Sequence, residues 1–221
     1  AGLLGVRLPE NFRQPYTAQS ISDLWRRWHM TLMRLLNDYI YSPLSLAMTR
    51  YAMRRSTGKW TTFVLAIALP VNFTFFVSGL WHGAGWNFIV FGVITGVAVS
   101  VEFAWRRARM PQVPAIGAWL LTMLTFLVSI CFFRAGSLEK AVDILLAPMF
   151  GSWIGIAAFM GRNLFPILLI FLFVLFHRFD DHRRIRIAVR RTRPELVWCA
   201  IVLGWIVAVS VSQGNSGKFV Y

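Results

Sequence analysis

The chain has 221 residues with a formal net charge of +14, a hydrophobic share of 57%, 19 Phe and 10 Trp. This composition differs strongly from that of an ordinary soluble domain and indicates a membrane protein. The positive charge does not indicate nucleic-acid binding, because the basic residues are grouped between apolar runs and form no long basic face or Lys-rich tail.

The first predicted element is an amphipathic helix that begins at Ser20, where residues 20–23 have the pattern of a capping box. One face is aromatic and apolar at helical spacing: Trp25, Trp28, His29, Leu32 and Leu36. The other face is charged and polar: Asp23, Arg26, Arg27, Arg34 and Asn37. Such a helix suits the membrane interface, or packing beneath a bundle with its basic side toward water or lipid phosphate.

Several residues of this segment have two interpretations. His29 is either a buried histidine bonded to a neighbour or a functional group. Arg26 and Arg27 fit a solvated helix face, or they contact the phosphates of an acyl carrier or nucleotide-bearing donor. Asp38 is expected to pair with Arg34 at i,i+4 and not to act as an acid.

The rest of the chain predicts an all-α, multispanning bundle of transmembrane helices in one membrane domain over residues 1–221. Residues 1–58 hold the interfacial helices, and residues 59–221 hold about five spans, near residues 60–80, 84–105, 113–133, 164–176 and 196–212. Pro70 lies inside the first span and Asn72 follows it, so an irregular or kinked helix is expected there.

The charges between the spans predict an orientation. Every second connection is strongly basic: Arg50, Arg54, Arg55 and Lys59; then Arg106, Arg107 and Arg109; then Arg178, Arg183, Arg184, Arg186, Arg190, Arg191 and Arg193. The positive-inside rule places these connections in the cytoplasm and His82 toward the outer side of a bacterial inner membrane, which the chain crosses several times.

His82 lies between the first two spans, in a stretch from residue 60 to residue 101 that contains no Asp, Glu, Lys or Arg. An ionisable side chain there is costly, which favours a functional role over a hydrogen bond to a backbone carbonyl. Ser78, one turn earlier, either bonds the ring or packs, and Asn72 either orients a reacting group or satisfies backbone freed by Pro70. Trp81 and Trp86 are expected to help line a dry pocket.

Motifs for other chemistry are missing from the sequence. Cys131 and Cys199 lie in apolar runs without a nearby His or acid, so they are interpreted as small hydrophobes. There is no Gly-rich phosphate loop, paired-cysteine zinc motif or GxSxG elbow. We therefore expect no metal and no tightly bound cofactor.

Four ordered blocks, at residues 9–16, 22–32, 37–44 and 79–84, resemble the membrane-bound O-acyltransferase family. They include Trp-Arg-Arg-Trp-His at 25–29 and Gly-Leu-Trp-His-Gly at 79–83. The likeness is strongest to a bacterial branch that includes the alginate O-acetylation membrane subunit and the exporter of D-alanine for teichoic acids. Members have more helices ahead of the first block, so the chain resembles a C-terminal portion. Where alginate-type members carry a Gly-Gly pair and a basic loop after Pro-Leu, this chain has Ser45 to Met48, which leaves the acceptor open.

The resemblance implies a catalytic role for His82, as a base that is neutral near pH 7, and a role for His29 in positioning donor or acceptor. The supporting residues would be Trp81, Asn72, Ser78, Asp38, Arg26, Arg27 and Trp28. The implied activity moves an acyl group, most simply acetyl, from a cytoplasmic donor such as acetyl-CoA or an acyl carrier to a hydroxyl of a polysaccharide beyond the membrane, with a periplasmic acetyltransferase as a possible partner. The alternative is a transporter or channel subunit with a polar path lined by His82 and Asn72, although the paired broken helices of many transporters are missing from the sequence.

Overall fold

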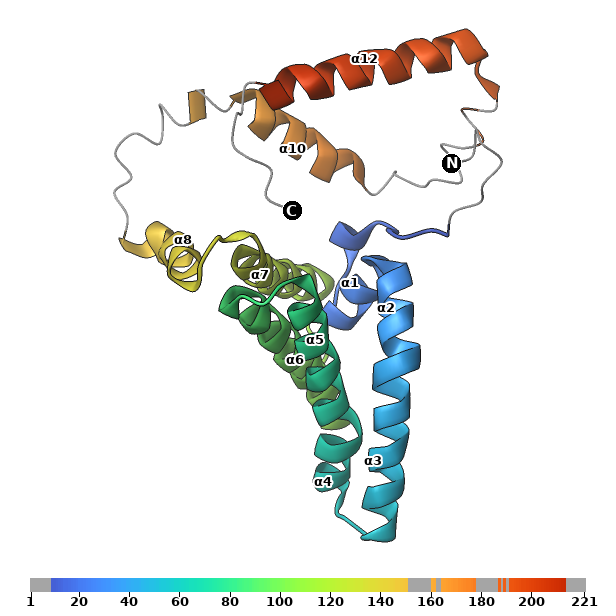
Figure 1. Cartoon of the computed structure of the whole chain (residues 1–221), viewed down its shortest axis with the longest axis vertical. Coiled ribbons are helices and arrows are strands. Elements are labelled where there is room, and N and C mark those ends of the chain that lie inside the picture. Colours follow the sequence, from blue (N-terminus) through green and yellow to red (C-terminus); the bar gives the residue numbers. More distant parts are fainter. Residues whose placement is uncertain are drawn as a thin grey trace. The chain divides into compact units, whose positions relative to one another are not determined.

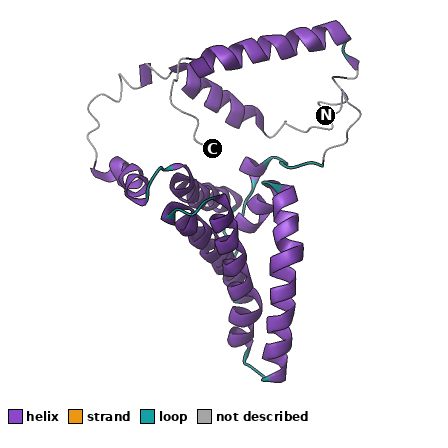
Figure 2. Cartoon of the chain, viewed as in Figure 1, coloured by secondary structure: helices purple, strands orange, loops and turns teal. Residues whose placement is uncertain are grey.

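The computed structural model describes residues 9–150, 160–161, 164–177, 187, 189 and 191–213. All regular structure in this part of the chain is helical, as predicted (Figures 1 and 2). The chain forms two compact units, Ala1–His177 and Arg178–Tyr221. The candidate site lies entirely in the first unit.

Within the described residues, three helices are long and apolar enough to cross a membrane: Lys59–His82 with 24 residues, Trp86–Arg107 (α6) with 22 and Ala115–Arg134 (α7) with 20. They confirm the first three predicted spans. The last two predicted spans are also helical, as α10 (Leu164–Phe176) and α12 (Pro194–Gln213), and their crossing of the membrane stays a prediction. Helix α8 (Leu138–Phe150), in the connection after α7, was not predicted.

The first spanning helix is irregular, as Pro70 predicted. It consists of α4 (Lys59–Phe63), a π-helical turn, η4 (Val64–Ala68), and α5 (Leu69–His82), with Pro70 in the first turn of α5. Proline has no N–H to donate to the carbonyl four residues earlier, that of Ala66. Ser45, in helix α3 (Ser42–Arg54), donates its hydroxyl to this carbonyl at 2.5 Å. A neighbouring helix thus satisfies the polar group that Pro70 leaves free, which lipid could not do.

Helices α5 and α6 form a tight antiparallel hairpin (Figure 1). A Cβ added at Gly92 would lie 2.3 Å from the Phe75 carbonyl oxygen, and one at Gly79 would lie 2.3 Å from that of Phe88. Small residues at these positions let the two backbones approach closely, as is usual between membrane helices. At one end of the hairpin Arg107 donates to the Lys59 carbonyl at 2.9 Å, and His82 lies at the other end.

The predicted single helix from residue 20 is wrong, because it breaks at Trp28 and His29. Helix α1 (Ile21–Arg27) ends before an extended Trp28, and His29 is left-handed, with φ 48° and ψ 49°, ahead of α2 (Met30–Leu36). The break is stabilised by an earlier segment: the Arg13 N–H donates to the Arg27 carbonyl, and the Met30 N–H donates to the Asn11 carbonyl, both at 2.9 Å. These tertiary bonds override the local helical periodicity.

After the break the chain runs on in one direction through α2, a second π-helical turn, η3 (Asn37–Tyr41), and α3 (Figure 1). The π-helical turn explains why the predicted Arg34–Asp38 pair does not form, since it changes the register of side chains four residues apart. Asp38 is exposed and accepts a hydrogen bond from Asn37 Nδ2 at 2.9 Å. Among the described ion pairs, none joins it to Arg34.

Helix α1 packs among the spanning helices. Its N-cap is Ser20, as predicted, with Oγ accepting from the Asp23 N–H at 3.2 Å. Ile21 packs with Val71, Phe75 and Val99, and Leu24 is fully buried beside Ala18 and Phe126. Trp25, on the predicted aromatic face, contacts Phe75 of α5 and Phe91 of α6, so this face packs against the bundle, the second of the two placements that the amphipathic pattern predicts.

Candidate active site

The two predicted histidines, 53 positions apart in the sequence, both lie at helix ends. His82 is the last residue of α5, and His29 precedes α2 in the left-handed conformation. His82 therefore lies at the end of a hairpin of apolar helices.

Aromatic rings surround His82. Its ring meets that of Phe133 at 4.8 Å between centroids and that of Phe91 at 6.4 Å, both edge to face. Phe91 in turn contacts Trp25 from α1, at 6.0 Å. These contacts give the partly buried His82 an apolar setting on the side of α6 and α7.

Of the two tryptophans predicted to help line a dry pocket, Trp81 contacts the His82 ring, whereas Trp86 is largely exposed. The Trp81 ring lies edge to face with that of His82 at 4.9 Å, but 65% of the residue is exposed. Trp86 is 73% exposed. Phe91 and Phe133 form the apolar surroundings in their place, because they lie on α6 and α7 at the level of His82.

His29 has a buried ring nitrogen, Nδ1, for which the structure records no hydrogen-bond partner. Nδ1 therefore does not make the bond to a neighbour that one of the two interpretations of His29 expects, and a functional role stays a prediction. A buried polar atom without a partner is costly and is typical of a position that meets a ligand or a reacting group. The neighbouring Trp28 packs edge to face on Phe12 at 5.1 Å and in a tilted arrangement on Phe126 at 5.3 Å, and it anchors the break.

Tyr16 also contributes to this packing. Its ring contacts those of Trp28 and Phe126, and its carbonyl accepts a hydrogen bond from Trp119 Nε1 at 2.8 Å. Burial raises the pKa of the Tyr16 hydroxyl above its ordinary value of 10.0. The phenol thus stays neutral at physiological pH.

A cavity of about 460 Å³ lies between α1, α2 and η3 on one side and α5 and α6 on the other. Its lining is mostly apolar and includes Trp25 and Phe75, whose rings also contact each other at 5.4 Å. Three cationic side chains line it as well: Arg26, Arg34 and Arg106. Trp25 lines the cavity and also contacts Phe91, a neighbour of His82, so this ring connects the cavity wall with the surroundings of His82.

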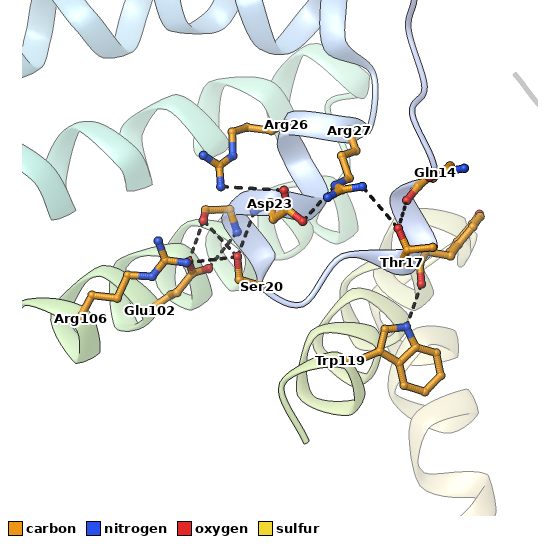
Figure 3. A network of polar contacts seen from close by, with 11 residues as sticks. Gln14, Thr17, Ser20, Asp23, Arg26, Arg27, Glu102, Arg106 and Trp119 are labelled. Carbon is orange, nitrogen blue, oxygen red and sulfur yellow. Dashed lines mark hydrogen bonds and ion pairs between the residues drawn. The ribbon is translucent and has the colours of Figure 1, made fainter. Parts of the chain in front are cut away.

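The arginines of α1 pair mainly within their own segment (Figure 3). Arg27 Nε donates to Asp23 at 2.9 Å, and Arg27 Nη1 reaches Thr17 at 3.4 Å. Arg26 comes no closer to Asp23 than 3.9 Å, and 69% of its side chain is exposed. Arg26 thus keeps the capacity for a phosphate contact, whereas Arg27 is engaged in holding α1.

Asn72 and Ser78, two of the predicted supporting residues, make no described hydrogen bond to His82. Asn72 donates its amide to the Ala68 carbonyl and to Ser100 Oγ, both at 2.8 Å, so it joins α5 to α6. The carbonyl freed by Pro70 is bonded by Ser45 and not by Asn72. Ser78 is buried, and the hydrogen bonds of the described residues include none between it and His82.

Two residues of the site escaped the sequence analysis. Glu102, in α6, accepts from the Ser22 N–H at 2.9 Å and from the Ser22 hydroxyl at 2.6 Å, and it pairs with Arg106 at 2.6 Å (Figure 3). Asn11 accepts hydrogen bonds from the first turn of α2. The signal for Glu102 was a single acid at the end of an apolar run, one turn before Arg106.

Within the described residues, no three His, Cys, Asp or Glu side chains gather as a metal site.

The fold and the site define a helical membrane protein with two histidines at helix ends, each in contact with aromatic rings. Residues 3–139 match the membrane-bound O-acyltransferase family, and since this is more than half of the chain, the chain belongs to that family.

Curated relatives agree with this assignment. Over 143 residues the chain is 38% identical to the peptidoglycan O-acetyltransferase of Helicobacter pylori, which covers 63% of this chain and 25% of the relative. It is 37% identical over 152 residues to the probable alginate O-acetylase of Azotobacter vinelandii, covering 68% and 28%. It is 28% identical over 109 residues to the teichoic acid D-alanyltransferase of Streptococcus thermophilus, covering 49% and 25%. The matches thus span about a quarter of the length of each relative.

Proposed function

We propose that the chain forms part of a membrane-bound O-acyltransferase that moves an acyl group, most simply acetyl, from a cytoplasmic thioester donor to a hydroxyl on a cell-envelope polysaccharide. The relatives named for peptidoglycan and alginate O-acetylation support this acceptor class. The observation that carries the proposal is the position of His82 among aromatic rings at the end of an apolar hairpin, with an arginine-lined cavity between that hairpin and α1 and α2.

In the proposed reaction His82 acts as the general base. Its imidazole takes the proton of the acceptor hydroxyl, and the oxygen attacks the thioester carbonyl. When the tetrahedral intermediate collapses, the carbon–sulfur bond breaks and the thiolate takes the proton from the imidazolium. An ester and a free thiol result, and the base is regenerated. The aromatic surroundings favour this route, because they shield the acyl group from water.

The cavity is the proposed donor site. Phe103 and Arg106, from the last turn and a half of α6, line it, and the basic residues at this end of the hairpin face the cytoplasm under the positive-inside rule. Arg26, Arg34 and Arg106 suit the phosphates of acetyl-CoA or of an acyl carrier's pantetheine arm. A periplasmic acetyltransferase is the proposed partner on the acceptor side, with the bacterial inner membrane as the location.

No described contact favours the transporter alternative. Asn72, which would line its polar path, directs its amide nitrogen to Ala68 and Ser100. The side chain is thereby committed to joining two helices.

The test is His82→Gln in the full-length protein, which keeps a polar side chain but removes the base. Loss of general-base catalysis commonly costs about 10²–10⁴ in rate, so turnover at saturating donor should fall by that factor while expression and membrane insertion persist. Transfer of radiolabelled acetyl to polysaccharide measures the effect.

His182→Gln is the matched control and should keep wild-type turnover, because His182, outside the described residues, belongs to a basic connection. Near-normal turnover in His82→Gln would make His82 a structural residue and overturn the mechanism.

A further inference from the structure

The backbone at His29 needs external support. A φ of 48° is unfavourable for any residue with a Cβ, and Gly or Asn is the usual choice there. A histidine holds this conformation only where its surroundings fix it. The left-handed turn separates α1 from α2 and sets the direction in which the His29 ring leaves the chain.

His29 also occupies the N-cap position of α2 without capping the helix. Its side chain makes no hydrogen bond to the first turn, where Ser, Thr, Asp or Asn would normally accept one. The first N–H groups of a helix have no partner within it, so another group must accept them.

Asn11 accepts these hydrogen bonds from outside the helix. Its backbone carbonyl accepts from the Met30 N–H at 2.9 Å. Its side-chain oxygen, Oδ1, accepts from the Thr31 N–H at 3.1 Å and from the Thr31 hydroxyl at 2.8 Å. On the other side of the break, Arg13 N–H bonds the Arg27 carbonyl. Asn11 therefore performs the capping function that His29 leaves vacant.

We propose that Asn11 is a positioning residue for His29, holding its left-handed backbone so that the imidazole is directed away from the first turn of α2 and its buried Nδ1 is left for a reacting group. The inference rests on the proposed function, because it assumes that His29 serves acyl transfer. Asn11 fits this role because a single side-chain oxygen can accept from two donors of the same residue.

The test compares three variants of the full-length protein. Asn11→Leu removes the acceptor with little change of volume, Asn11→Asp retains an acceptor oxygen, and Thr31→Val removes only the hydroxyl donor. The first readout is the rate at which diethyl pyrocarbonate modifies His29 and His82, followed by mass spectrometry. The second is the separation of kcat from KM for the acyl donor.

Asn11→Leu should increase modification of His29 severalfold and leave that of His82 unchanged. It should lower kcat by about 10- to 100-fold, as small displacements of a reacting group do, with KM for the donor nearly unaltered. Asn11→Asp should restore both readouts, and Thr31→Val should lie between wild type and Asn11→Leu. Gln112→Leu, at an exposed position after α6, is the matched loss of an amide and should change neither readout.

Equal defects in Asn11→Asp and Asn11→Leu would overturn the proposal, since the acceptor oxygen would then not be what matters. Unchanged His29 modification in Thr31→Val and Asn11→Leu would overturn it too. If Asn11→Leu fails to fold, the modification rate of His29 and the kcat of Thr31→Val and Asn11→Asp decide by the same criteria. Chemical modification of His29 can be measured without acyl transfer. If the wild-type protein transfers no acyl group, the proposed function is refuted, while the modification rates of the variants still test the role of Asn11.

Discussion

Glu102 links two helices through one carboxylate. One oxygen accepts from the backbone N–H of Ser22, near the start of α1, while the other accepts from the Ser22 hydroxyl and pairs with Arg106. Only 16% of this side chain is exposed. A carboxylate at a helix N-terminus is favoured by the free N–H groups there, and Arg106 compensates for its burial.

Glu102→Ala should lower the free energy of unfolding by about 1.5–3 kcal/mol, since hydrogen bonds to a charged group are lost and Arg106 loses its partner. Glu102→Gln should cost less, because it keeps one acceptor oxygen for Ser22. Thermal unfolding in detergent, followed by Trp fluorescence, measures both. Glu139→Ala, at an exposed position of α8, is the control, and a loss as large as that of Glu102→Ala would contradict the argument.

The candidate residues of the site differed in how much sequence could say of them. The place of His82 at the end of a spanning helix was predictable from the long uncharged stretch around it, and its catalytic role stays a prediction. The left-handed turn at His29 was not predictable, since it breaks a segment whose spacing predicts an unbroken helix. The bonds that make this break come from Asn11 and Arg13, in an irregular segment without a periodic pattern.

Among the elements, the α5–α6 hairpin is the most tightly packed. Gly92 faces the backbone of Phe75, and Gly96 faces that of Asn72, where an added Cβ would lie 2.9 Å from Cα. The two glycines are four residues apart, so they lie on one face of α6. This spacing is common where membrane helices associate through close backbone contact.

Gly92→Ala should push α5 and α6 apart and lower the free energy of unfolding by about 1–3 kcal/mol, as overpacking typically does. Thermal unfolding in detergent checks this. Gly204→Ala, in the helix α12, is the matched control, because a Cβ there meets no atom within 4 Å and should be neutral or slightly stabilising. If Gly92→Ala is as stable as wild type, α5 and α6 can move apart without a loss in the free energy of unfolding, and the packing argument is wrong.

The spanning elements were predictable and the short ones were not. Long apolar runs must form helices in lipid, so α6 and α7 follow from hydrophobicity alone. The π-helical turns and α8 depend instead on side-chain contacts. Ala141 of α8, for example, is fully buried against the cluster of Phe91, Phe132 and Ala135, which only the folded chain brings together.

At the scale of the whole molecule, the basic connections predict the orientation. A cysteine replacing Arg107 should resist an impermeant thiol reagent in intact cells, and one replacing Ser137 should be labelled. The background is a full-length protein without Cys131 and Cys199. Permeabilised cells, in which both positions should react, are the control. Labelling of the Arg107 position alone in intact cells would reverse the orientation and move the proposed donor cavity to the outer side.

The contacts of α1 also determine an order of assembly. Ser22 bonds Glu102, 80 positions later in the chain, and the Tyr16 carbonyl bonds Trp119, 103 positions later. The ribosome makes residues 9–36 before α6 and α7, yet the polar groups of this segment find these protein partners only once both helices exist. Until then water must satisfy them, because buried backbone groups need partners. The contacts that fix α1 in the bundle therefore form only after both spanning helices have been made.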